Sequence, residues 1–334
     1  MKKNHLKKTT SILAFTIAVF FGISANAQLP GTTADEVILS TSPQFPRSNE
    51  SVSVSVKSFS YNLDNSNIAW FVDDVLVREG IASMDIDIET GNVGTRIRVS
   101  VVVSTDTGFI VREDITIYPA DVDILWQADS YSPPFYRGKK LAPPDGDVEV
   151  IAMPRIANTF GSLVSSEGLI YTWTRNNKVI GSQSGKGKRV FSTKAPFGEE
   201  VDVISVKVST PDGLVTGGRL VEVSSSEPKI VFYEEDPLLG QMFNKAIDKD
   251  FGVGEEEKQF TAYPYFFSVD NRNSNDLDFL WQVNGREIEN LDEDRGSLVV
   301  ANEGGGSGSS ILSLDIRNLV RIFQSASAGF SINF

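Results

Sequence analysis

Apolar and polar residues alternate along most of the chain after residue 50. The alternation is clearest in SVSVSVKSF (51–59), MDIDIE (84–89), TRIRVSVVV (95–103), ISVKV (204–208) and ILSLDI (311–316). A period of two predicts β-strands with one buried face, and helical periodicity is almost absent. Turn residues such as Gly, Asn, Asp and Pro recur about every ten residues, which favours antiparallel sandwiches over a parallel sheet with crossover helices.

A tryptophan motif occurs three times, as IAWFVDDVLV (68–77), YTWTRNNKVI (171–180) and FLWQVNGREI (279–288). In each copy a large apolar residue stands two positions before the Trp, a turn pair follows at plus three and plus four, and a β-branched residue follows at plus seven. This internal repeat predicts three similar units. We expect Trp70, Trp173 and Trp281 to lie in the structural core, each between two sheets with its N–H on a backbone carbonyl. Stacking of these rings on a sugar is the functional alternative, which their apolar neighbours disfavour.

The repeat continues beyond each tryptophan. A glycine-marked turn leads into an alternating strand, a hairpin turn and a closing strand, which in the third copy is FSINF (330–334) with Phe330, Ile332 and Phe334 on its buried side. The resulting domains are residues 28–119, 120–226 and 227–334. The joints between them are only a few residues long, too short for a flexible tether, so neighbouring domains are expected to touch and stack into a rod.

The motif around Trp173 resembles a known family of domains. A strand ending in Tyr-x-Trp, then a turn of Asn or Gly type and a second strand, is similar to the third strand of bacterial immunoglobulin-like domains and the related PKD-type domains. In PKD domains the Trp is typically followed by Asp-Phe-Gly-Asp-Gly. No copy here matches, and Phe71-Val72-Asp73-Asp74 comes nearest but lacks both Gly. The resemblance implies an all-β protein of three tandem immunoglobulin-like β-sandwich domains, of the kind found in exported bacterial repeat proteins.

Residues 1–27 have the pattern of a signal peptide. Four lysines precede an apolar stretch at 11–23, and Ala25-Asn26-Ala27 provides small residues before an expected cleavage at Gln28. An uncleaved membrane anchor is the alternative, although a membrane span needs roughly 20 apolar residues. No second apolar run of that length follows. We therefore expect no membrane span after signal cleavage, and a secreted, cell-surface or periplasmic location.

Composition restricts the chemistry. The single His is His5, inside the expected signal peptide, and the chain has no Cys. This excludes a Ser-His-Asp triad, a thiolate nucleophile, the usual zinc sites and disulfides from the mature chain. Four of the 31 Lys and Arg residues lie in residues 1–27, so 27 remain against 44 Asp and Glu, for a net charge of −17. Such a chain is not expected to bind nucleic acid, which requires clustered positive charge.

Two aromatic clusters stand apart from the repeat, SYSPPFYRG (130–138) and AYPYFF (262–267). Loops that bear aromatic residues are common binding sites, so Tyr131, Phe135 and Tyr136 are candidate contacts for a carbohydrate or a protein partner. The alternative is that these rings cap the sandwiches or fill a joint between domains. We favour this second interpretation.

Acidic residues suggest two calcium candidates. Asp85, Asp87 and Glu89 line one face of a strand, and LDEDRG (291–296) is an acidic loop. Calcium needs six to eight oxygens from several directions, so a solvated strand face is the preferred interpretation and no metal ligand is predicted. No catalytic residue or cofactor site is predicted either, since no pair of carboxylates is singled out for glycoside cleavage.

The sequence therefore predicts a non-catalytic, exported protein that acts as a rod-like spacer, adhesion or assembly component of a bacterial cell surface or envelope. The alternative is a carbohydrate-binding protein or an accessory module of a sugar-processing system. A protein partner and a surface-glycan partner both remain open.

Overall fold

The computed structural model describes residues 37–253, 257–289, 293–302 and 306–334, so the expected signal peptide lies outside the described residues. The described residues form 24 β-strands and two short 3₁₀ turns. Their six sheets pack in pairs around three hydrophobic cores. The predicted fold class is confirmed, because the chain consists of three tandem immunoglobulin-like β-sandwiches.

The first domain has seven strands. They are β1 (Ile38–Ser42), β2 (Ser51–Lys57), β3 (Asn67–Val72), β4 (Val75–Ile81), β5 (Asp85–Glu89), β6 (Ile97–Ser104) and β7 (Ile110–Ile117), with a 3₁₀ turn at Leu63–Asn65. The sheets have the orders β1-β2-β5 and β4-β3-β6-β7, with antiparallel pairing throughout. The first strand thus pairs with the second and the second with the fifth, while the third pairs with the sixth, which is the arrangement of an immunoglobulin-like sandwich.

The second domain repeats this order. Its strands are β8 (Asp121–Asp129), β9 (Asp147–Arg155), β10 (Ile170–Arg175), β11 (Lys178–Val179), β12 (Gly185–Lys186), β13 (Val190–Lys194), β14 (Val201–Ser209) and β15 (Thr216–Ser224), with a 3₁₀ turn at Gly181–Gln183. The sheets are β13-β9-β8 and β11-β10-β14-β15, with the short β12 beside β10. The internal repeat seen in the sequence is therefore a repeat of strand order as well.

The third domain adds two strands. Its strands are β16 (Lys229–Asp236), β17 (Gly240–Ile247), β18 (Asp250–Gly252), β19 (Lys258–Tyr265), β20 (Leu277–Val283), β21 (Arg286–Glu287), β22 (Ser297–Val300), β23 (Ser309–Asn318) and β24 (Ser325–Asn333). The additions are β17, which forms a hairpin with β16, and β18, which runs parallel to β24. The expected closing strand is β24, where Phe330 and Ile332 are buried and Phe334 packs half-buried against the core.

Alternation places the cores as the sequence pattern predicts. Val52, Val54 and Val56 of β2 are buried, and their core also contains Val99, Val101 and Val103 of β6. The three turn pairs after the tryptophans all have positive φ, as at Asn176 (51°) and Asn177 (63°). Two successive residues with positive φ form the hairpin turn whose twist matches that of the flanking strands, and Asn, Asp and Gly tolerate this conformation.

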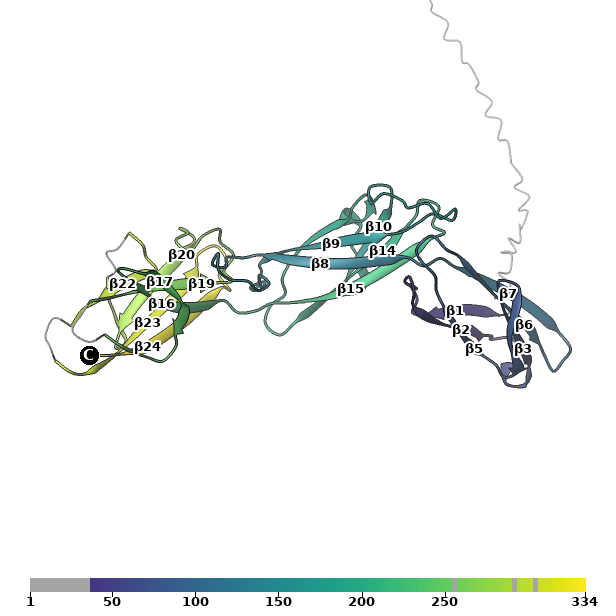
Figure 1. Cartoon of the computed structure of the whole chain (residues 1–334), viewed down its shortest axis with the longest axis horizontal. Helices are drawn as coiled ribbons and strands as arrows, with labels where there is room; N and C mark the ends of the chain where they lie inside the picture. Colours follow the sequence, from purple (N-terminus) through teal and green to yellow (C-terminus); the bar gives the residue numbers. More distant parts are fainter. Residues whose placement is uncertain (1–36, 254–256, 290–292, 303–305) are drawn as a thin grey trace, which may run out of the picture.

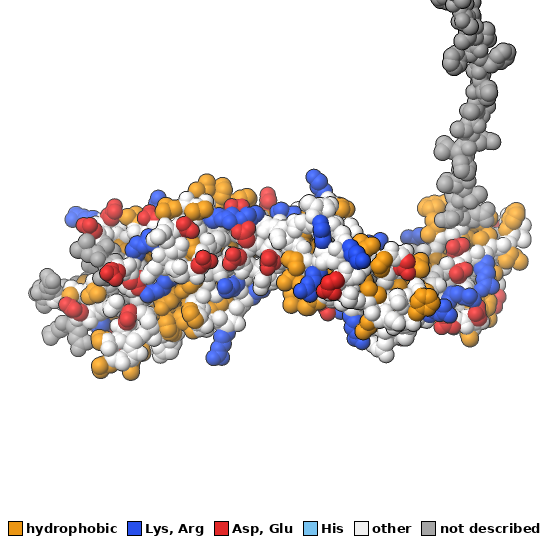
Figure 2. Space-filling model, turned by 90° about the horizontal axis from the view of Figure 1, so that it is seen from above, with side chains coloured by type: hydrophobic (Ala, Val, Ile, Leu, Met, Phe, Trp, Pro, Cys, Tyr) orange, Lys and Arg blue, Asp and Glu red, His pale blue; other side chains and the backbone are white. Residues whose placement is uncertain are grey.

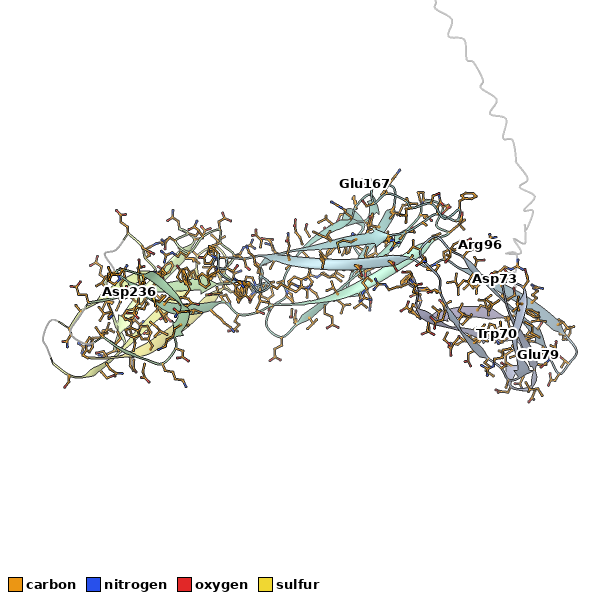
Figure 3. The ribbon with its side chains drawn as sticks, viewed as in Figure 1. Trp70, Asp73, Glu79, Arg96, Glu167 and Asp236 are labelled. Atoms are coloured by element: carbon orange, nitrogen blue, oxygen red, sulfur yellow. The ribbon has the colours of Figure 1, made fainter. Side chains whose placement is uncertain are left out.

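The repeated tryptophans are buried between the sheets. Trp70 and Trp173 have no exposed surface and Trp281 has 1%, and Trp70 is labelled inside the first sandwich in Figure 3. The indole N–H of Trp70 donates to the carbonyl of Ser83 at 2.7 Å, and the corresponding distances in the other domains are 2.8 and 3.0 Å. The positions of these rings are therefore fixed by packing and by a hydrogen bond.

The three domains follow one another along the long axis of the molecule (Figure 1). The strands leave three residues between β7 and β8 and four between β15 and β16. No helix in the described residues is long and apolar enough to cross a membrane.

Candidate functional site

The loop between β8 and β9 carries the aromatic residues that the sequence singled out. Tyr131, Phe135 and Tyr136 are each half-buried, and they pack against residues of the third domain. We name this group of side chains the joint cluster. It consists of Tyr131, Phe135, Tyr136, Leu141, Val231, Tyr233, Tyr263, Tyr265 and Phe266. The two aromatic segments of the sequence thus meet at the joint between the second and third domains.

Phe135 and Tyr136 pack against aromatic rings of the third domain. The ring centroid of Phe135 lies 3.9 Å from that of Phe243 and 5.8 Å from that of Tyr263. Tyr136 contacts Tyr265 and Phe266 edge-on, at 5.7 and 5.6 Å. Aromatic pairs of this kind contribute about 0.5–1.5 kcal/mol each beyond the area they bury. For these two residues the structure agrees with the interpretation that the rings fill a joint.

Tyr131 differs from its two neighbours. It makes no ring-to-ring contact among the described residues, whereas its main chain crosses the joint. The Tyr131 N–H donates to the carbonyl of Phe267, and the Phe266 N–H donates to the carbonyl of Tyr131, both at 2.7 Å. Phe266 has a φ of 64°, which is uncommon for a bulky residue and marks a conformation that the surroundings must hold in place.

The phenols at the joint are held in their neutral form. Burial raises the pKa of Tyr131 to about 12, with a smaller contribution from Tyr263. Burial and the hydrogen bond with Tyr233 raise the pKa of Tyr265, whose hydroxyl lies 3.2 Å from that of Tyr233. These phenols therefore stay neutral at any physiological pH.

A second contact between these domains comes from the loop between β23 and β24. Arg321 donates from Nη1 to the carbonyl of Asp145 at 3.0 Å and from Nη2 to the carboxylate of Asp147 at 2.7 Å. Gln324 is fully buried and donates to the carbonyl of Pro144 at 3.0 Å. The second and third domains are thus joined by aromatic packing on one side and by a hydrogen-bonded arginine on the other.

The joint between the first and second domains is closed by polar contacts. Arg47 pairs with Asp123 at 2.8 Å. The Ser48 N–H and hydroxyl both donate to the carboxylate of Asp121, at 2.9 and 2.7 Å. The Ala120 N–H donates to the carbonyl of Pro46 at 3.0 Å. The loop after β1 is therefore bonded to the start of the second domain.

Glycine residues bring the main chains of these two domains into contact. A Cβ atom on Gly94 would lie 2.9 Å from the Gly161 carbonyl oxygen, and a Cβ atom on Gly161 would lie 3.0 Å from that of Gly94. Both residues have positive φ. Phe45 similarly occupies the space where Gly218 lacks a side chain. Larger residues at these positions are incompatible with the observed joint.

A cleft opens beside the joint cluster. It has a volume of about 500 Å³ and is lined by Asp129, Tyr131 and Lys140 of the second domain and by Tyr263, Asp270 and Arg272 of the third. We name it the joint cleft. A hollow of about 660 Å³ on the β13-β9-β8 sheet adjoins it, because the two share Asp129 and Lys140. Tyr131, one of the aromatic residues singled out by the sequence, therefore lines a cleft.

Trp126, the tryptophan outside the repeat, lies in β8 and packs half-buried against the core of the second domain. The Nζ atom of Lys139 lies 2.9 Å from the centroid of its ring. Burial lowers the pKa of this lysine. Since the lysine covers the ring, Trp126 is not a free stacking surface.

The acidic candidates do not form a site among the described residues. Asp85, Asp87 and Glu89 lie exposed along β5. No group of three or more acidic or His side chains in the described ranges is placed to hold a metal ion. Residues 290–292 of the acidic loop lie outside the described residues, while the Asp294 carboxylate accepts bonds from Arg272, Ser297 and Gly296.

Three carboxyl groups among the described residues have a shifted pKa, and they lie apart from one another. Backbone N–H groups lower the pKa of Glu167 and of Asp236, with Ser166 assisting at Glu167. Hydrogen bonding from the Thr210 hydroxyl lowers that of Asp212. Glu167 and Asp236 lie on different domains (Figure 3). Glu167 and Asp212 are exposed and Asp236 is half-buried at the end of β16. The three carboxyls do not form the facing acid pair that glycoside hydrolysis requires.

No family model and no curated protein sequence matches the chain. A solved fibronectin-III array of RIM-binding protein is 13% identical with a TM-score of 0.29, covering 89% of this chain and 95% of that one. Three N-terminal domains of the highly immunogenic outer capsid protein of bacteriophage RB49 are 11% identical with a TM-score of 0.26, covering 89% and 97%.

The fibronectin(III)-like modules of Clostridium thermocellum CbhA are 12% identical with a TM-score of 0.26, covering 57% of this chain and 94% of that chain. TM-scores this low say nothing about function. The strand order of the chain itself defines the fold.

Proposed function

We propose that this protein is a non-catalytic, exported component of a bacterial cell surface or envelope, where it acts as a rod-like spacer, adhesion or assembly element. The observation that carries the proposal is that both joints are closed by direct contacts. The second and third domains share aromatic packing and the Arg321 hydrogen bonds. The first and second share the Arg47 and Ser48 bonds and the glycine contact.

Closed joints give a tandem protein a fixed length and direction. A spacer or adhesion element needs both properties, because a flexible chain would allow its two ends to approach each other. A catalytic role has less support, since the mature chain has no His or Cys and its shifted carboxyls are single. Export rests on the predicted signal peptide.

Distance measurements between spin labels test the rod. Because the chain has no Cys, single cysteines introduced at exposed Lys178 and Glu287 can carry the labels without background. We expect a narrow distance distribution between the second and third domains. Arg321→Ala should broaden it, whereas Arg317→Ala, an exposed residue of β23, should leave it unchanged. A broad distribution in the wild-type chain would contradict the rod.

Export is tested separately by expressing the full chain in a bacterial host. We expect the protein outside the cytoplasm with Gln28 as its first residue, as determined by mass spectrometry. Retention of residues 1–27 would favour the membrane-anchor alternative.

A second candidate function is carbohydrate binding, as a surface-glycan receptor or an accessory module of a sugar-processing system. The observation that favours it is the joint cleft, where Tyr131 lies between two domains together with charged and polar side chains. Ligand sites occur preferentially in clefts at domain interfaces.

A further inference from the structure

The joint cleft is lined by polar side chains that have no partner among the described residues. Among the described residues, the hydroxyl of Tyr131, the Nζ of Lys140 and the carboxylates of Asp129 and Asp270 make no hydrogen bond or ion pair. Elsewhere at this joint Arg321 is paired with Asp147. Four groups that converge on one cleft without internal partners are available to bond a ligand in place of water.

The wall of the cleft also has an unmet donor. Arg272 pairs with Asp294 through Nη2, and its guanidinium lies 5.2 Å from the centroid of the Tyr263 ring. Its Nη1 atom is buried and has no hydrogen-bond partner among the described residues. Buried donors are normally satisfied in native proteins, so an unmet donor beside a cleft suggests a missing partner such as a water or a ligand oxygen.

The charges of the cleft indicate the class of ligand. Among the described residues that line the cleft, Arg272 is paired with Asp294, whereas Lys140, Asp129 and Asp270 form no ion pair. A polyanion would be repelled by the carboxylates, and a polycation would meet Lys140. The surface seen in Figure 2 shows acidic and basic side chains interspersed, with no large area of one sign on that face. Neutral hydroxyl groups fit all of these side chains, because each hydroxyl both donates and accepts.

Tyr131 supplies an apolar surface next to these polar groups. Its ring is half-buried and packs against the joint cluster, without the close ring pairs that Phe135 and Tyr136 make. An aromatic body with a polar tip suits a ligand that has both apolar faces and hydroxyl edges. Sugar rings have this character.

The size and rigidity of the site support an extended ligand. The joint cleft and the adjoining hollow have volumes of about 500 and 660 Å³ and share two lining residues. Each lies in the range of about 300–1,000 Å³ that is usual for ligand sites. The closed joint fixes the two walls before a ligand arrives, and this preorganisation lowers the entropic cost of binding.

We propose that the joint cleft binds a neutral oligosaccharide, with Tyr131 under a sugar ring and Asp129, Lys140 and Asp270 bonded to its hydroxyls. This proposal rests on the second candidate function and is independent of the rod. The ligand lies across the border between the second and third domains.

Calorimetric titration of the chain from Gln28 with cellohexaose, xylohexaose, maltohexaose and chitohexaose tests the proposal. Hexagalacturonic acid and a lysine-rich peptide serve as charged probes. We expect at least one neutral hexasaccharide to bind. Tyr131→Ala should weaken binding by about tenfold or more, because it removes the ring on which the sugar packs. Asp270→Ala should weaken binding by a similar factor, because it removes a charged hydrogen-bond partner.

The matched controls are Lys57→Ala and Asp106→Ala, which remove exposed charges of the first domain, away from the cleft, and should leave the affinity unchanged. The spin-label distances, measured on each variant, show whether the joint is intact. Failure of all four neutral probes to bind would overturn the proposal, as would binding that is indifferent to Tyr131→Ala and Asp270→Ala. Tighter binding of either charged probe would also overturn it. In each of these cases a narrow distance distribution would leave the rod standing.

Discussion

At the scale of single residues, each repeated tryptophan connects the two sheets of its own domain. Its ring belongs to β3, β10 or β20, and its N–H donates to the carbonyl of the residue two positions before a strand of the opposite sheet. The acceptors are Ser83 before β5, Lys188 before β13 and Arg295 before β22. One side chain therefore sets both the spacing and the register of the two layers.

Replacing Trp173 by Ala should lower the free energy of unfolding of the second domain by about 3–5 kcal/mol, the usual cost of truncating a buried aromatic side chain. Thermal unfolding followed by calorimetry should show the other two domains nearly unchanged, because each has its own core. Trp126→Ala is the control within the same domain and should cost less, since Trp126 is only half-buried. Wild-type stability of Trp173→Ala would mean that this ring is not a core residue.

The pKa of Tyr131 predicts a loss of stability in alkaline solution. The neutral phenol is favoured in the folded state, so its contribution to stability is complete below pH 10.0, the ordinary pKa, and is lost as the pH rises toward about 12. Phenolate absorbance should show a group that titrates late and that disappears in Tyr131→Phe. Titration of all eight tyrosines together near their ordinary pKa would contradict this prediction.

At the scale of elements, strand β24 holds the third domain together from two sides. It pairs with β23 along its length and with β18 near its end, and it buries Phe330 and Ile332 in the core. The parallel pairing with β18 is absent from the sheets of the other two domains as described. Strand β24 therefore joins β18 and β23 in one sheet and contributes two side chains to the core.

Deleting residues 330–334 should unfold the third domain and leave the first two folded. The two buried side chains contribute about 2 kcal/mol each, against a total of about 5–15 kcal/mol for a typical domain, and the pairing with β18 is lost as well. Limited proteolysis should then degrade the chain only beyond the second domain. A third domain that stays resistant after this deletion would show that the strand is dispensable.

Alternation and turn chemistry were sufficient to predict most strands and the buried residues on them. Strand β17 was missed because its side chains have no alternating pattern, with four consecutive exposed residues from Phe243 to Ala246.

The sequence indicated that Tyr131, Phe135 and Tyr136 were unusual, but it could not separate Tyr131 from the other two. That distinction depends on Phe243 and Tyr265, which come from other strands of the third domain and meet the loop only after folding.

At the scale of the whole molecule, the two joints are built differently. Aromatic rings and an arginine connect the second domain to the third, whereas polar contacts and a glycine pair connect the first to the second. Short connections in the sequence predicted that the domains would touch. They carried no information on the angle at which neighbouring domains meet, because this angle is set by contacts such as Gly94 with Gly161.

Gly161→Ala should open the joint between the first and second domains. The new Cβ atom would lie 3.0 Å from the Gly94 carbonyl oxygen, so the domains must separate or tilt. Gly108→Ala is the matched control, because Gly108 has a similar φ of 88° but no atom within 4 Å of the added Cβ. Small-angle X-ray scattering should show a changed maximum dimension for the first variant only. Equal effects of the two substitutions would attribute the change to backbone strain instead of the joint.

The contact between Gly94 and Gly161 has a consequence for how such a protein can evolve or be engineered. Tandem domains are often treated as interchangeable modules that can be duplicated, deleted or reordered. The first domain contacts the second where Gly94 and Gly161 have no side chains. The second domain contacts the third through the aromatic rings of the joint cluster. Inserting one more copy of a domain would create at least one joint between two surfaces that do not match, because the two joints use different residues. A joint can be transferred to another protein only together with both of the domains that form it.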